Sequence, residues 1–143
     1  MKLNAMIQDV DAVNDGAWVG KKYGTPIPGF GDLCLKVRGT DSRKYRLVVA
    51  VKRKALTQGD YTDEGDIKDE VAERNFIEAV DEALLLDWDH LEDDHGGLMK
   101  HTPELQTKIL NDPGSTPFRS AVIVAANMVS ARRLYNEKAI EKN

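Results

Sequence analysis

Hydrophobic and polar residues alternate in the first third of the chain in a pattern that predicts short β-strands. In DLCLKVRG, the side chains of Leu33, Leu35 and Val37 point one way and the intervening ones point the other. This period of two is typical of a half-buried strand. The apolar AWV at 17–19 is a second strand candidate, and a Gly- and Pro-rich loop separates the two. We therefore expect a small β-hairpin or meander over residues 16–40.

The pattern changes to a helical period further along the chain. From about Ile67 to Trp88, apolar residues recur at Ile77, Val80 and Leu84, which is the spacing of one helical stripe. This pattern predicts a central helix with its last turns in LLLDW.

Two later helices are predicted by the residues that begin them. Thr102 is a suitable N-cap with Pro103 at N1, and Thr116 and Pro117 repeat the arrangement. The final helix carries a regular apolar face that includes Val122.

One segment, residues 41–56, fits both types of structure. Its LVVAV run is β-branched, which favours a strand. Yet Tyr45, Val48, Val49 and Lys52 lie at helical spacing behind residues able to cap a helix. The pattern alone leaves helix and strand equally favoured.

These elements predict an α+β fold, mostly α, in which a β-hairpin or meander precedes a bundle of about four helices. The length of 143 residues fits a single domain, 1–143. Within it we expect a flexible arm at 1–15, the β element at 16–40, a helical part at 41–135 and a frayed tail at 136–143.

Charge is unevenly distributed, although the net charge is only -4. Residues 36–54 hold eight Lys/Arg against one Asp, whereas residues 60–95 hold fifteen Asp/Glu against two basic residues. Such a layout favours complementary packing within a chain or between copies, and predicts a homo-oligomer. We interpret the basic stretch RKYRLVVAVKRK as a packed amphipathic element, because its centre is apolar and the acidic segment follows it. We therefore expect no nucleic-acid partner.

No apolar run approaches the ~20 residues of a membrane span, so we expect no membrane association. A single cysteine, Cys34, excludes an intramolecular disulfide and fits a reducing compartment. Together these features predict a protein of the host cytoplasm.

The strongest candidate for chemistry is LLLDWDHLEDDHGG, residues 84–97, with five acidic residues and two histidines. An EF-hand beginning at Asp87 fails at its third ligand, where Leu91 stands. The three histidines of the chain are spaced by five and six residues, so no pair shares a helical face. We interpret the acidic residues as the solvated end of a helix and expect no catalytic residue, metal or cofactor. An enzyme, the least favoured class, would depend on this segment alone.

The order of segments resembles that of a known group of phage proteins. GAWV and GFGDLCLKVRGTDSRKYRLVVA are followed by LLLDWDHLEDDHGG, TPELQTKILNDP and TPFRSAVIVAAN. This order is similar to that in the tail assembly chaperones of long-tailed phages and prophages. The resemblance covers about residues 16–130 and implies that residues 42–56 are helical.

The resemblance also implies a non-enzymatic role. Such chaperones coat the tape-measure protein in many copies and are shed before the virion is complete. In many phages a ribosomal frameshift adds a second domain that recruits the tail tube protein, and this chain would then be the shorter product. The alternative is a structural virion protein, such as a head–tail connector or tail-completion factor.

For a chaperone, we expect apolar residues on helices to contact the client. The candidates are Trp88, Phe118, Val122 and Met128. For each of them, packing in the protein's own core is the competing interpretation.

Overall fold

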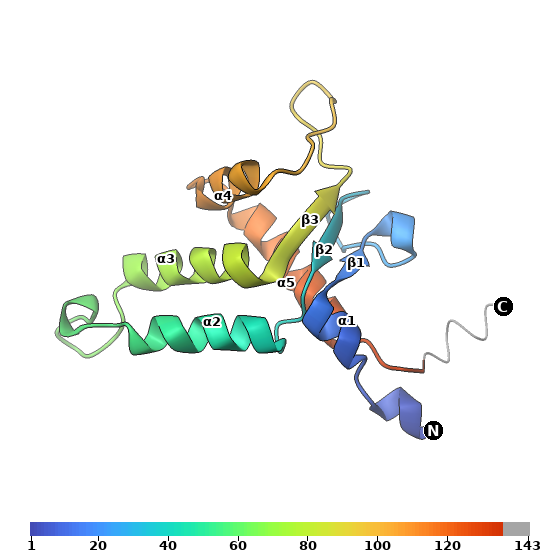
Figure 1. Ribbon diagram of the computed structural model, residues 1–143. Helices are drawn as coiled ribbons and strands as arrows, with labels where there is room; N and C mark the ends of the chain where they lie inside the picture. Colours follow the sequence, from blue (N-terminus) through green and yellow to red (C-terminus); the bar gives the residue numbers. More distant parts are fainter. Residues whose placement is uncertain (136–143) are drawn as a thin grey trace.

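The computed structural model describes residues 1–135 and contains a three-stranded antiparallel sheet in the order β1-β2-β3 (Figure 1). The strands are β1 Ala17–Val19, β2 Cys34–Val37 and β3 Leu85–Asp89. The central strand β2 pairs with β1, as expected for the predicted hairpin or meander. In this pairing Trp18 lies opposite Lys36. On its other edge β2 pairs with β3, which places Leu35 opposite Trp88.

Five α-helices lie on or beside this sheet in the described part of the chain. They are α1 Val10–Asp15, α2 Arg43–Lys54, α3 Asp69–Ala79, α4 Pro103–Asn111 and α5 Thr116–Ser130. Helices α2 and α3 form a hairpin that projects away from the sheet (Figure 1). Within residues 1–135, none of the helices is long and apolar enough to cross a membrane.

The main core lies where α5 packs against the sheet. Leu35 and Val37 of β2 are fully buried, as are Val122, Ala125 and Val129 of α5. The predicted α+β class with mostly α content is therefore confirmed. The structure adds the arrangement, because α5 packs on the sheet whereas α2 and α3 pack on each other and project away from it (Figure 1).

The segment that fits both helix and strand by its pattern is helix α2. The hydroxyl of Ser42 accepts a hydrogen bond from the backbone amide of Tyr45, at 3.3 Å, and so caps the first turn. Val48 packs with Ala79 and Ala83 in a small second core. The β-branched residues are compatible with a helix here because one side of α2 is buried against α3 and the turn that follows it.

The predicted central helix ends earlier than its periodicity suggests. Regular helix stops at Ala79, and a π-helical turn, Val80–Leu84, leads directly into β3. The change from helix to strand leaves backbone carbonyls without intrahelical donors. The buried side chain of Gln106 lies at this junction, with Nε2 2.9 Å from Oδ1 of Asp81, 3.0 Å from the carbonyl oxygen of Leu85 and 3.2 Å from that of Asp81. The part of the chain predicted to be only helical therefore contains a strand.

The prediction of a flexible arm over 1–15 is wrong for its second half. Helix α1 begins after Asp9, whose side chain accepts a hydrogen bond from the amide three residues on. Val13 is only 2% exposed, and its carbonyl accepts a hydrogen bond from the amide of Gly39. The amide of Asp9 also donates to the carbonyl of Arg132, at 3.0 Å. Long-range contacts, which sequence periodicity does not report, hold this short helix in place.

Gly39 lies where α1, the end of β2 and the end of α5 meet. A Cβ atom at this position would lie 2.4 Å from Oγ of Ser130 and 2.8 Å from Cγ1 of Val13. Both distances are far shorter than van der Waals contact, so any side chain would force these elements apart.

The two ends of the described chain are hydrogen-bonded to each other. The carbonyl of Ile7 accepts from the amide of Leu134 at 3.0 Å, and that of Asn4 accepts from Tyr135 at 3.2 Å. The tail predicted to fray, 136–143, lies outside the described residues.

The helix starts predicted from Thr-Pro pairs are found, with one shift. The hydroxyl of Thr102 accepts from the amide of Leu105 at 3.1 Å, so the predicted cap of α4 is confirmed. Helix α5 starts one residue earlier than predicted, with Ser115 in the N-cap position. The Ser115 hydroxyl donates to the carbonyl of Ile109 and is therefore not used as a cap.

Replacing Gln106 by leucine should destabilise the fold, because the buried carbonyls beside its amide would lose their donor. We expect Q106L to lower the free energy of unfolding by about 1–3 kcal/mol in urea denaturation. The matched control is T107V, on the same helix as Gln106. It removes an exposed 2.6 Å hydrogen bond from the Thr107 hydroxyl to Asp81 and should cost less. Equal losses for the two variants would contradict the role given to Gln106.

Candidate interaction surface

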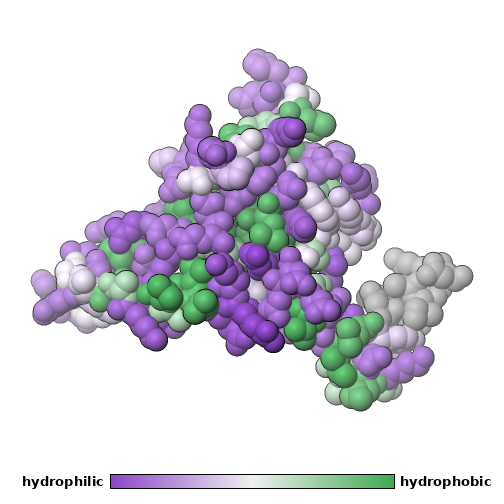
Figure 2. All heavy atoms as spheres, in the orientation of Figure 1, coloured by the Kyte–Doolittle hydropathy of each residue, from purple (hydrophilic) through white to green (hydrophobic). Residues whose placement is uncertain are grey.

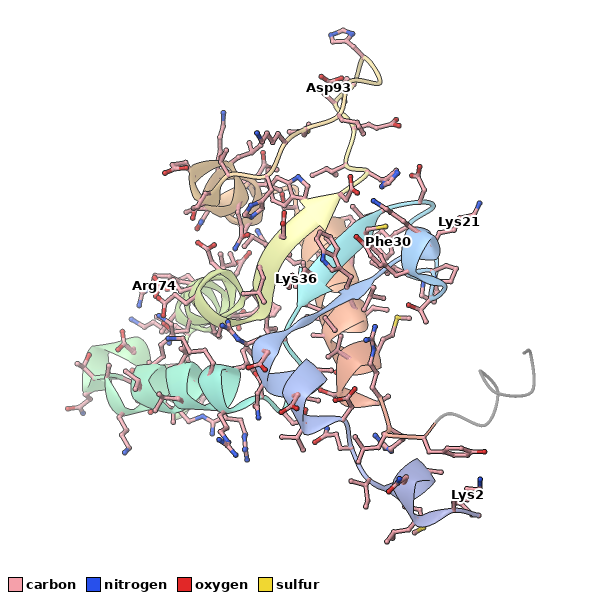
Figure 3. The ribbon with its side chains drawn as sticks, turned by 45° about the vertical axis from the view of Figure 1, so that its right-hand side comes forward. Lys2, Lys21, Phe30, Lys36, Arg74 and Asp93 are labelled. Carbon is pink, nitrogen blue, oxygen red and sulfur yellow. The ribbon has the colours of Figure 1, made fainter. Side chains whose placement is uncertain are left out.

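The acidic segment at 84–97 is a strand and a turn, not the end of a helix. Beyond β3 the chain forms a loop that projects from the body, with Asp93 in it (Figure 3). The Asp93 carboxylate accepts hydrogen bonds from the amides of His95, at 2.8 Å, and Gly97, at 2.9 Å. This carboxylate therefore stabilises the turn itself.

Asp89, the last residue of β3, is tied to the other side of the sheet. The amide of His90 donates to its carboxylate at 2.8 Å, and Nζ of Lys22 lies 3.2 Å from it. These contacts, the amide first, lower the pKa of the Asp89 carboxyl below its usual value. The carboxylate therefore remains ionised at neutral pH, which suits a structural ion pair and not a proton donor.

Trp88 is a structural anchor for the segment that leads to α4. Its indole Nε1 donates to the carbonyl of Met99 at 2.8 Å. The ring meets His101 edge-on at a centroid distance of 4.5 Å and Phe118 at 6.2 Å. His101 in turn lies 2.7 Å from the amide oxygen of Gln106. Trp88, His101 and Gln106 thus satisfy one another. Nδ1 of His90, buried in the same region, has no hydrogen-bond partner among the described residues.

The histidines and carboxylates do not gather into a metal site in the part of the chain that the structure describes. Among residues 1–135, no group of three or more His, Cys, Asp or Glu side chains is placed to hold an ion. Cys34 is fully buried, with its thiol against the backbone of Asp32.

The four predicted interaction residues are not equally accessible. Trp88 is 4% exposed and Val122 is fully buried, so neither side chain is available to a partner in this conformation. Phe118 and Met128 are partly buried and pack against the same core. A binding role for these residues stays a prediction, and core packing accounts for the position of each.

An apolar groove that the sequence did not reveal lies between the helices. A cavity of about 210 Å³ between α2 and α3 is lined by Tyr45, Val49 and Phe76. Phe76 also lines a second cavity, of about 320 Å³, together with Ile123 and Val124 of α5. We call this pair of cavities the apolar groove. Figure 2 shows hydrophobic residues reaching the surface over the α2–α3 hairpin, and a second group at the N-terminal segment.

Three helices contribute to the groove, which is why one helical period could not predict it. The sequence indicates only part of the groove, because Tyr45 and Val49 lie at helical spacing in residues 41–56. The side chain that lines both cavities of the groove is Phe76 of α3.

A comparison with protein-family models identifies the family of this chain. The model of the YdaY prophage protein family matches residues 40–143. The chain belongs to this family. No curated protein and no solved structure matches it. The matched region holds every element that lines the apolar groove, whereas β1 and β2 lie outside it.

Replacing Trp88 by phenylalanine should leave the ring contacts but remove the hydrogen bond to the carbonyl of Met99. We expect W88F to lower the free energy of unfolding by about 1–3 kcal/mol, measured by chemical denaturation. The control is W18F, because Trp18 is half-exposed and stacks on Tyr23 through its ring. A W88F protein as stable as the wild type would show that the indole hydrogen bond does not anchor the segment.

Proposed function

We propose that this YdaY-family prophage protein is a non-enzymatic tail assembly chaperone. It binds an apolar helical segment of the tape-measure protein in the host cytoplasm and leaves before the virion is complete. The observation that supports this proposal is the open apolar groove formed by α2, α3 and α5. The resemblance of the segment order to tail assembly chaperones supports the same assignment.

The groove has the chemistry that suits an amphipathic helix. Such a helix places apolar side chains at positions i, i+3, i+4 and i+7 along one face, and a groove between helices buries that face. The walls offer aromatic and branched side chains from Tyr45, Val49, Phe76 and Ile123. Burial of these partly exposed side chains by a client releases roughly 25 cal/mol per Å² of apolar surface.

Of the two α2 cations that line the groove, Lys52 is paired with neighbouring carboxylates, whereas Arg53 makes no ion pair among the described residues. Nζ of Lys52 lies 2.6 Å from the Glu78 carboxylate and 3.4 Å from that of Glu82. The hydrogen bond that Lys52 donates to the Glu78 carboxylate is the main cause that raises the pKa of the Lys52 ammonium. The lysine therefore stays charged and paired, and a client pays no penalty for leaving it without a partner.

Co-expression with the tape-measure protein of the same prophage tests the proposal. The wild-type chain should co-purify with the tape-measure protein and increase its soluble fraction. Substitutions that add bulk at small, exposed groove residues, A72W and S120W, should weaken the complex by roughly tenfold, because they fill the two cavities. The matched control is K108W, which adds the same ring on the exposed side of α4.

Two results would overturn the proposal. The first is a wild-type chain that neither co-purifies with the tape-measure protein nor increases its solubility. The second is the presence of the chain in purified phage particles, detected by mass spectrometry, which would identify a structural virion protein instead.

A further inference from the structure

The outer side of helix α2 combines exposed apolar residues with a ring of positive charge. Leu47 is 61% exposed and Val51 is 58% exposed, although both are large and apolar. They flank the buried Val48 along the helix, on the part of α2 that the packing against α3 leaves uncovered. The exposed cations around them are Arg43, Lys44, Arg46, Arg53 and Lys54. We call this surface the basic face.

The basic face makes no ion pair in the described part of its own chain, although the charge of Arg46 is one cause that lowers the pKa of the Asp41 carboxyl. Among residues 1–135, none of its five cations lies within 4.0 Å of a carboxylate oxygen. Lys52, on the inner side of α2, is the cation that pairs with α3. Like charges on adjacent turns of a helix repel one another by a few tenths of a kcal/mol per pair, so a partner with negative charge would stabilise this face.

The connector between α2 and α3 has the opposite character. Residues 60–70 contain six acidic side chains and one lysine, which gives a local charge of −5. The exposed acidic residues include Asp63 and Glu64, which make no ion pair among the described residues. The same connector exposes apolar side chains, with Tyr61 39% and Ile67 38% accessible. We call it the acidic connector.

We infer that the basic face of one copy docks against the acidic connector of a second copy of this chain. Both surfaces place exposed apolar groups among charges, and the charges are of opposite sign. The acidic connector lies beyond the far end of α2 in its own chain (Figure 1). It meets the basic face only at that end, where Asp60 lines one cavity with Val51 and Ile67 lines another with Arg53. Because Leu47 and Val51 stay mostly exposed, a neighbouring copy supplies the complement for the rest of the face.

The charges exclude one form of the contact. Two basic faces placed against each other would bring five cations against five, with repulsion at every approach. A contact between the basic face and the acidic connector avoids this repulsion. It can close as a two-fold dimer in which each copy supplies both surfaces, or continue from copy to copy into a ring or an open chain. The inference goes beyond the proposed function, and its test needs no client.

Charge reversal of each surface, alone and in combination, tests the inference by sedimentation velocity over a range of concentrations. The wild type should associate beyond the monomer at about 0.05 M salt and dissociate at about 0.5 M salt. K44E/K54E, on the basic face, and D63K/E64K, on the acidic connector, should each associate at least about tenfold more weakly. An equimolar mixture of these two variants should recover association, because the unchanged basic face of one variant then meets the unchanged acidic connector of the other.

The mixture is also the control for folding, since only folded chains can recover the contact. A wild type that stays monomeric at low salt, or reversed variants that associate like the wild type, would overturn the inference. So would a mixture that stays dissociated. If K44E/K54E loses affinity for a DNA duplex while its self-association is unchanged, the basic face binds nucleic acid and the inference is wrong.

Discussion

The fold depends on one abrupt change of backbone conformation, which a single amide side chain supports. At the end of α3 the chain passes through a π-helical turn and becomes strand β3 without a loop. Gln106 reaches from α4 and lies within hydrogen-bonding distance of the carbonyls of Asp81 and Leu85 at this junction. If α3 continued as a helix, β2 would lose the partner on one of its edges and Trp88 would leave the core. The sheet, the docking of α4 and the direction of the α2–α3 hairpin all follow from this junction.

Local sequence signals predicted the elements whose stability is mainly local. The alternation around Leu35 and the cap at Thr102 identified β2 and the start of α4, because pleat and capping geometry depend on near neighbours. The resemblance to phage chaperones, and not the pattern, favoured a helix for α2. The run Leu84–Trp88 was misassigned because its spacing fits a helical stripe, while its actual structure depends on Gln106 and β2. Both partners are distant in sequence.

The surface was harder to predict than the core for a related reason. Burial depends on which side of a helix meets another element, and Val122 and Leu47 have the same apolar character in the sequence. In the structure the first is fully buried and the second is mostly exposed. The groove at Phe76 requires three helices to be placed relative to one another, which no single period encodes. The sequence shows that charge is unevenly distributed. The structure is needed to distinguish paired cations such as Lys52 from the unpaired ones on the basic face.

The hydrogen bonds between residues 4–7 and 134–135 join two segments that are far apart in sequence. The N-terminal segment lies away from the α2–α3 hairpin (Figure 1). Loosening of either segment therefore loosens the other, at a distance from the walls that α2 and α3 give to the groove.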